Sequence, residues 1–224
     1  MIRYLPPLLV GLVGCAILIS LGVWQVQRLA WKESLLAEIE AKISATPGPL
    51  PAAPDPALHT FLPVEARGTV SDELRVLASV KRRGPGYRVI SVLTTDEGRR
   101  ILLDRGFRGV ETKSDLSEPT AVSVTGNLHW PDEIDSFTPP PDLDEGLWFA
   151  RDVPAMAETL DTEPTLLVAR SIAPADRFIA EPLPVGTDGI PNDHLQYAVT
   201  WFSLCLVWAG MTGLWLWRIT RRTG

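Results

Sequence analysis

His194 is the residue of this sequence best suited to bind a metal ion. It follows Pro191 and Asn192 and comes just before an uncharged stretch from Tyr197 to Trp217. If Asn192 caps a helix that begins here, the positive end of the helix dipole favours a neutral imidazole, the form that ligates metals. The pattern therefore predicts a candidate ligand in the first turn of a helix. The alternative is a histidine that only hydrogen-bonds a neighbouring loop.

A second group of residues could hold an anion. Trp24, Arg28 and Trp31 have the helical spacing i, i+4, i+7, which predicts a guanidinium between two indoles on one face. Such a face could clamp a carboxylate of a ligand embedded in a membrane. The alternative is an aromatic belt at the membrane surface whose cation extends toward water, and this needs no ligand.

Tryptophans also mark one face of the last apolar stretch. Trp201, Trp208 and Trp215 recur every seven residues, and small residues recur between Gly11 and Gly22 in the first apolar stretch. We expect the indoles to pack into that small-residue face or to contact lipid. The functional alternative is a flat aromatic wall for a planar hydrophobic ligand between two helices.

Other catalytic or metal-binding chemistry has little support in the sequence. Cys15 and Cys205 both lie in apolar stretches, so we expect no disulfide framework, CxxC redox centre or thiolate zinc site. Ser79–Lys81 and Lys113–Ser114 are the local serine–lysine neighbours. They leave a membrane-anchored Ser/Lys hydrolase as a remote alternative.

Two apolar stretches predict membrane-spanning helices at residues 5–26 and 192–217. The 21 residues from Tyr197 to Trp217 carry no charge, and a helix of that length is about 31 Å long, enough to cross a bilayer core. Leu12–Cys15 resembles a lipoprotein cleavage site and Ser20–Gly22 a signal-peptidase site. The apolar stretch is nevertheless long for a cleaved signal, so we expect an uncleaved anchor.

The first helix is expected to continue beyond the membrane over residues 27–44, because apolar residues recur every four positions from Trp31 to Ile43. Residues 45–57 are rich in proline and predict an extended, semi-rigid spacer. From there the period changes to two, which predicts a β-rich domain over residues 58–190.

This domain contains short runs rich in Val, Leu and Ile, separated by Gly, Asp or Pro. The predicted strands are Phe61–Val70, Leu74–Val80, Tyr87–Thr94, Arg100–Arg105, Ala121–Leu128, Trp148–Arg151 and Thr165–Arg170. Asp152 is the expected N-cap of a short helix, and His59 and His129 are interpreted as surface or packing residues. The predicted fold class is a membrane protein of the α+β type. Two transmembrane helices flank a mainly antiparallel β domain, built as a small sandwich or open barrel.

Charge predicts the orientation and excludes one class of partner. Arg218, Arg221 and Arg222 give residues 218–224 the character of a basic cytoplasmic tail, so both termini are expected in the cytoplasm and the β domain in the periplasm of a bacterial inner membrane. Residues 24–193 contain all 27 acidic residues and 21 − 4 = 17 basic ones, a net charge of −10. That charge is unsuited to nucleic acid or, in bulk, to anionic lipid.

Three separated motifs share their order and layout with one known family. They are Gly22-x-Trp24-Gln25-x-x-Arg28-x-x-Trp31-Lys32, then Gly84-Pro85-Gly86-Tyr87 with Arg105-Gly106-Phe107, and finally Asn192-x-His194-Leu195-Gln196-Tyr197-Ala198-x-Thr200-Trp201-Phe202. The chain thereby resembles the surfeit locus protein one family of cytochrome oxidase assembly factors. The resemblance covers the chain except the proline spacer and residues 131–147. Phe107 stands where the family usually has tryptophan.

The resemblance implies a non-enzymatic assembly factor for a haem–copper terminal oxidase. In bacterial members it implies that haem a is bound and passed to oxidase subunit I, with a haem A synthase as a further partner, and with His194 as the iron ligand by position. The reading of the residues fits this role, with Trp24, Trp31, Tyr197 and Trp201 as aromatic candidates for contact with the cofactor and Arg28 at the depth where propionates would lie. The alternative is a haem-free membrane scaffold that recognises oxidase subunits.

Overall fold

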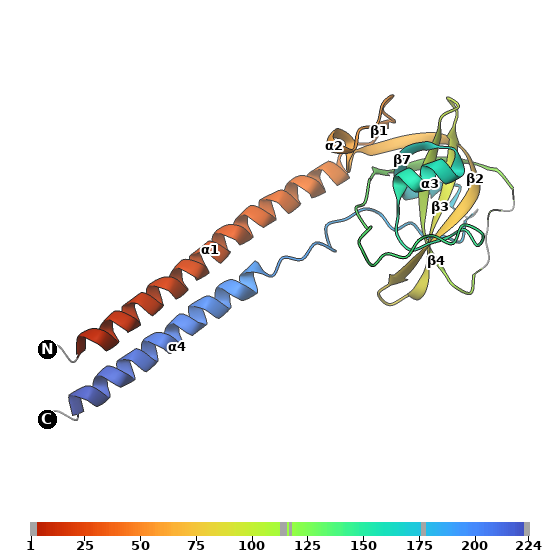
Figure 1. Ribbon diagram of the computed structural model, residues 1–224. Helices are drawn as coiled ribbons and strands as arrows, with labels where there is room; N and C mark the ends of the chain where they lie inside the picture. The colour runs from red at the N-terminus through yellow and green to blue at the C-terminus, as the bar shows by residue number, and fades with distance from the viewer. Residues whose placement is uncertain (1–3, 113–115, 117, 176–177, 222–224) are drawn as a thin grey trace. The chain divides into compact units, whose positions relative to one another are not determined.

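The chain folds into two compact units in a computed structural model that describes residues 4–112, 116, 118–175 and 178–221 (Figure 1). One unit, here called the helix pair, combines Met1–Glu38 with Thr187–Gly224. The other, here called the β domain, comprises Ile39–Gly186.

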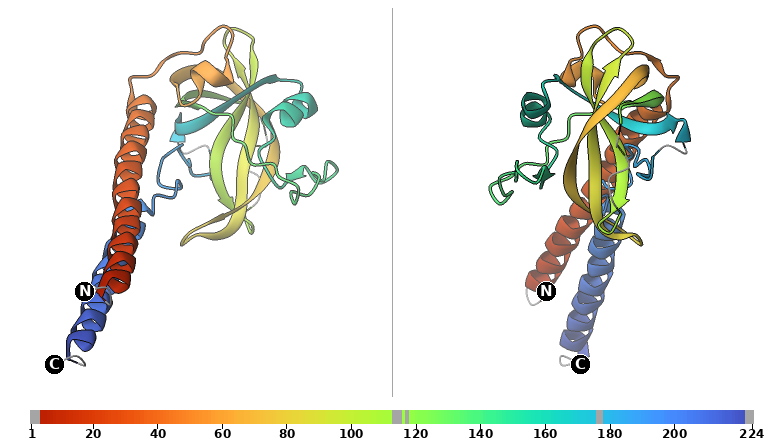
Figure 2. Two further views of the ribbon diagram at one scale, coloured as in Figure 1. Left: turned by 60° about the vertical axis from the view of Figure 1, so that its left-hand side comes forward. Right: turned by 90° about the vertical axis from the view of Figure 1, so that its right-hand side faces the viewer.

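The helix pair is built from α1 (Leu5–Ser44) and α4 (His194–Arg221), which lie side by side in Figures 1 and 2. Both helices are long and apolar enough to cross a membrane. The predicted extension is confirmed as helix, because α1 runs without interruption to Ser44. The second span was predicted over residues 192–217, whereas α4 begins two residues later and extends to Arg221.

The start of α4 corrects the predicted cap. The first helical hydrogen bond runs from the Tyr197 N–H to the Asp193 carbonyl oxygen over 3.1 Å, so Asp193 occupies the cap position. Asn192 is therefore not the N-cap. Its side-chain oxygen is buried and has no hydrogen-bond partner among the residues that the structure describes.

Small residues of α1 form a seam against α4. A side chain added at Gly14 would place its Cβ 2.2 Å from the Trp208 indole nitrogen, and one at Gly22 would meet the Phe202 ring at 2.6 Å. Glycine therefore lets large residues of one helix fit closely against the backbone of the other. This confirms the expected packing of indoles on a small-residue face for Trp208. Trp215, in contrast, is half exposed.

The predicted spacer is fastened to the β domain. Within it, β1 (Gly48–Pro49) pairs in parallel with the next strand, and Arg99 donates a hydrogen bond to the Pro51 carbonyl over 2.7 Å. Asp55 caps the short helix α2 (Pro56–His59). Prolines lack an N–H but keep their carbonyl, so this segment can join a sheet edge as an acceptor.

The strands of the β domain close into a ring. They are β2 (Pro63–Val80), β3 (Gly84–Thr95), β4 (Arg100–Gly109), β5 (Thr120–Leu128) and β7 (Glu163–Ala173), with β6 (Leu147–Trp148) beside β2. Pairing runs β2–β3–β4–β7–β5 and returns from β5 to β2. The expected open barrel or sandwich is thus wrong. The ring is mixed, because β4 and β7 are parallel and the other four pairings antiparallel.

One long strand makes the closure possible. The sequence predicted separate strands at Phe61–Val70 and Leu74–Val80, but β2 joins them through a bulge between Ser71 and Glu73. A bulge bends a strand, so the first half of β2 can pair with β5 while the rest follows β3. The expected strand Trp148–Arg151 is shorter and earlier, at β6.

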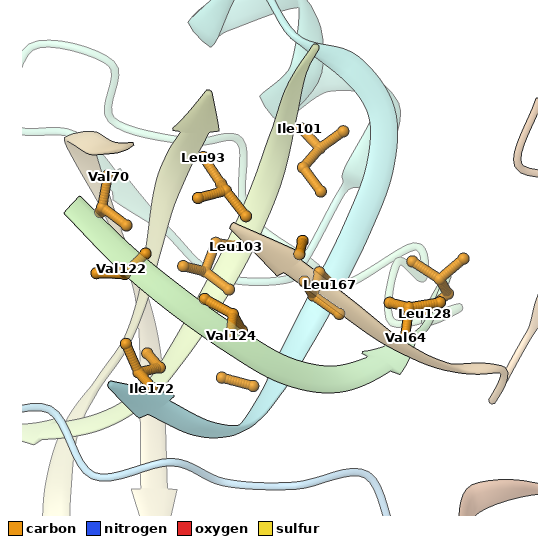
Figure 3. Close-up of a cluster of buried hydrophobic side chains, with 12 residues drawn as sticks. Val64, Val70, Leu93, Ile101, Leu103, Val122, Val124, Leu128, Leu167 and Ile172 are labelled. Carbon is orange, nitrogen blue, oxygen red and sulfur yellow. The ribbon is translucent and has the colours of Figure 1, made fainter. Parts of the chain in front are cut away.

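Two apolar clusters fill the β domain. The first lies between the strands of the ring and includes Val64, Val70, Leu93, Ile101, Leu103, Val122, Val124, Leu128, Leu167 and Ile172 (Figure 3). The second lies under α3 (Val153–Leu160), where Met156 contributes to the cluster that contains Leu102. The alternation of Ile101, Leu102 and Leu103 between clusters follows the two-residue period of a strand. Asp152 caps α3 as predicted.

The segment that leaves the β domain is held by β4. Phe107 and Glu181 exchange backbone hydrogen bonds of 2.8 and 2.9 Å. At Gly106, with a φ of 107°, a Cβ atom would lie 1.9 Å from the Glu181 carbonyl oxygen. Only glycine fits there, which gives the Arg105-Gly106-Phe107 motif a structural role.

Candidate functional site

The imidazole of His194 is held by a side chain of the other helix. Its Nδ1 atom lies 2.8 Å from Oε1 of Gln25, which is 8% exposed on α1. An amide oxygen only accepts hydrogen bonds, so the imidazole donates its proton from Nδ1. In the neutral ring the lone pair is then on Nε2, which is the atom left to bind an electrophile.

Gln25 was not predicted as a site residue. Burying a polar amide in an apolar helix is unfavourable unless it is hydrogen-bonded, and the His194 ring supplies that partner. Gln27, two residues later, is exposed. A signal for Gln25 was nonetheless present, because it follows Gly22 by three residues and so shares the seam face.

Arg28 is engaged with one indole only. Its guanidinium carbon lies 3.8 Å from the centre of the Trp31 ring, and within the described residues Arg28 has no second aromatic partner. The predicted position between Trp24 and Trp31 is therefore wrong. Both indoles are about half exposed, at 53% and 48%. The stack orients the cation, and the exposed indole surfaces remain free to meet lipid or a ligand.

The two aromatic candidates on α4 differ in their surroundings. Trp201 is half-buried, and its indole N–H is fully covered without a hydrogen-bond partner in the described part of the chain. Tyr197 is 54% exposed. Tyr197 lies about one helical turn after His194, and Trp201 lies two turns after it. Both are therefore close to the helix face that carries the imidazole. The structure thus brings His194 together with Gln25, and it leaves Trp24 and Tyr197 at the surface.

The set of donor atoms determines which metal could bind. Among the described residues, no group of three or more His, Cys, Asp or Glu side chains could hold a metal ion. A bare zinc or copper ion needs such a group. One imidazole nitrogen suffices for an iron that already has four porphyrin nitrogens, so the residues present fit a haem.

The remaining candidates from the sequence have other roles or no support. Ser79 and Lys81 are exposed at the end of β2, and no hydrogen bond joins them in the described part of the chain; Lys113–Ser114 lies outside the described residues. His59 accepts a hydrogen bond from the Asp55 N–H, and His129 stacks on Phe61 with ring centres 5.3 Å apart. Both histidines thus act in local packing, as expected.

Buried charges of the β domain form a network of their own. Asp104 is fully buried and accepts hydrogen bonds from Arg88 at 2.7 Å and from the Gly106 N–H at 2.9 Å, with Arg151 at 3.4 Å. Arg151 also binds Glu133, and although burial opposes the charge, these bonds hold the pKa of Glu133 below its usual value. Because each of these charges has partners, removing one of them would leave another buried charge uncompensated. The sequence did not predict it, since its members are far apart in the chain.

Known proteins are similar to this chain over most of its length. The model of the SURF1 family matches residues 12–206, which include all six predicted site residues. Surfeit locus protein 1 of Rattus norvegicus is 31% identical over 232 residues, covering 91% of this chain and 72% of that protein. The human protein of that name is 31% identical over 233 residues, which cover 91% of this chain and 74% of the human protein. A SURF1-like protein of Rickettsia felis is 26% identical over 88% of this chain and 91% of its own length.

Proposed function

Because the chain belongs to the SURF1 family, whose members are known generally as cytochrome oxidase assembly factors, we propose that it binds haem a at His194 and aids its insertion into oxidase subunit I. The observation that carries this proposal is the 2.8 Å contact between His194 Nδ1 and Gln25 Oε1. This contact fixes the imidazole tautomer with the proton on Nδ1, which leaves Nε2 as the ligand atom.

Each residue of the site has a role in this proposal. His194 Nε2 would hold the haem iron, and the haem, when bound, would supply a Lewis-acidic metal that a single imidazole can ligate. Gln25 orients the ring. Arg28, stacked on Trp31, would provide the cation for a propionate, and Trp24, Tyr197 and Trp201 would offer aromatic surface to the porphyrin. A carrier must also release its cargo, and one protein ligand is easier to exchange than two.

The proposal includes a place in the cell. Two helices that can span a membrane support a membrane protein, and we place it in the bacterial inner membrane with both termini cytoplasmic and the β domain periplasmic. A haem A synthase is the class of enzyme that would supply the pigment, and subunit I would receive it. Reporters inserted near Pro54 and fused after Gly224 should give periplasmic and cytoplasmic signals, respectively; the opposite pair would refute this topology.

The direct test is to purify the chain from cells that make haem A and to extract and identify the pigment. We expect a Soret band from the wild type and loss of most bound haem from His194→Ala, with a shifted spectrum for any that remains. His59→Ala is the matched control, since His59 bonds only within the β domain, and it should keep its haem. A colourless wild-type protein that still supports oxidase assembly would instead indicate the haem-free scaffold. Normal haem content and spectrum in His194→Ala would eliminate His194 as the ligand.

A further inference from the structure

A groove opens on the helix pair in the half of α4 farther from His194. It has a volume of about 420 Å³ and is bordered by Val10 of α1 and by Trp208, Met211, Trp215 and Arg218 of α4. This volume falls within the range of small-ligand sites. No candidate residue for haem borders it, so the proposed carrier function leaves the groove unused.

The groove combines apolar walls with one cation. Its walls are indole, thioether and aliphatic surfaces, and Arg218 borders it at the end of the apolar stretch. Arg218 has no hydrogen bond or ion pair with any described residue. The sequence from His194 onward contains no Asp or Glu that could neutralise it. Arg221 differs, because its guanidinium carbon lies 4.1 Å from the centre of the Trp217 ring.

We propose that the groove binds an anionic phospholipid, with an acyl chain against Trp208, Met211 and Trp215 and the phosphate at Arg218. Basic side chains beside a cleft between membrane helices favour anionic headgroups. An arginine can reach the headgroup level while its aliphatic part stays in the apolar region. The charge of Arg218 selects an anionic over a zwitterionic lipid, and the apolar walls select a lipid over free phosphate.

The test measures lipid retention by native mass spectrometry. The full chain is equilibrated in mixed micelles with equal amounts of dioleoyl phosphatidylglycerol and dioleoyl phosphatidylcholine. We expect the wild type to retain phosphatidylglycerol about fivefold more, which is the preference that one basic residue near a membrane surface provides. Arg218→Gln should reduce that ratio to about one. Arg221→Gln, which removes an equal charge from the same helix, should leave the ratio unchanged.

A second measurement locates the acyl chain. Phosphatidylglycerol with brominated chains should quench tryptophan fluorescence of the wild type more than that of Arg218→Gln, and excess inorganic phosphate should not reverse the quenching. Equal retention of both lipids by the wild type would overturn the proposal. An equal fall in the phosphatidylglycerol preference of both arginine variants would also overturn it. A lipid-free dimer would also overturn it, because the groove would then be covered by a second copy.

Discussion

The helix pair and the β domain differ in how their buried polar side chains are hydrogen-bonded. In the helix pair, the buried side chain of Gln25 makes a hydrogen bond to His194. The described part of the β domain buries Asp104 together with three arginines, Arg105, Arg108 and Arg151, and Asp104 is paired with Arg88 and Arg151. Separating buried charges that are paired with one another is costly, whereas a single hydrogen bond beside a free lone pair leaves an atom available to a ligand. The difference fits the proposed function, in which the helix pair would supply the binding chemistry and the β domain a stable fold.

Removing the centre of the β-domain network should have the largest effect. Asp104→Ala leaves the guanidinium groups of Arg88 and Arg151 without that carboxylate in a buried position, so we expect the free energy of unfolding to fall by about 3–5 kcal/mol. Urea titration of the purified chain measures this loss. Asp144→Ala is the control, since Asp144 is exposed, and it should change stability by less than about 0.5 kcal/mol. Similar losses in both variants would contradict the role of the network.

The hydrogen bond between Gln25 and His194 in the helix pair should instead affect ligand binding. Gln25→Leu removes the acceptor for His194 Nδ1, and loss of such a supporting hydrogen bond lowers affinity by about 10- to 100-fold. Haem titration followed by the Soret band measures the change, and urea unfolding of the β domain should not respond. Gln27→Leu, an exposed glutamine on the same helix, should bind haem normally. Equal affinity of the Gln25→Leu variant and the wild type would show that the bond does not position the ligand.

The sequence predicted the elements better than their connections. Two long apolar stretches identified both long helices, hydrophobic periodicity identified the extension of α1, and the Asp152 cap identified α3. Local sequence patterns could not predict the ring. Its closure depends on a bulge in β2 and on pairing between β2 and β5, which are distant in sequence. The start of α4 was missed by two residues, since Asn192 and Asp193 are equally good caps by type.

The site was predictable in part for a similar reason. The type and position of His194 singled it out, and helical spacing linked Arg28 to Trp31. Gln25 was missed because its partner is on the other helix, and no local pattern states which helix faces meet. Arg28 stacks on Trp31 and not on Trp24. A guanidinium at the middle of an i, i+4, i+7 series can turn toward either ring.

Acid should destabilise the β domain through His129. Burial, with a smaller contribution from the Arg151 cation, lowers the pKa of His129 from 6.5 to about 4. The unfolded chain thus takes up the proton first, and stability is expected to fall as the pH decreases from 6.5 toward 4. Allowing for partial exposure, the loss is about 2 kcal/mol. Unfolding curves across this range measure it, and His129→Phe should flatten the dependence. An unchanged slope in that variant would assign the effect to other groups.

The smallest expected effect belongs to Arg28. If its cation binds a propionate, Arg28→Leu should lower haem affinity about threefold, as for an exposed charge pair, while membrane insertion stays normal. Arg28→Lys, which keeps the charge, should lose less. Haem titration in membranes of known protein content separates these outcomes. Unchanged affinity in Arg28→Leu would make the residue part of an aromatic belt and would leave the helix pair with one polar contact to its ligand.

The Gln25–His194 bond joins residues 169 positions apart on two helices, so a ligand at Nε2, as proposed, would link its own binding to the pairing of these helices. Linkage is reciprocal: if closer pairing raises ligand affinity by some factor, the ligand strengthens pairing by that same factor. Gly14 and Gly22 determine how closely the helices approach. If haem binds as proposed, these glycines would therefore influence its affinity from a distance, and the bound haem would in turn strengthen the pairing of the two helices.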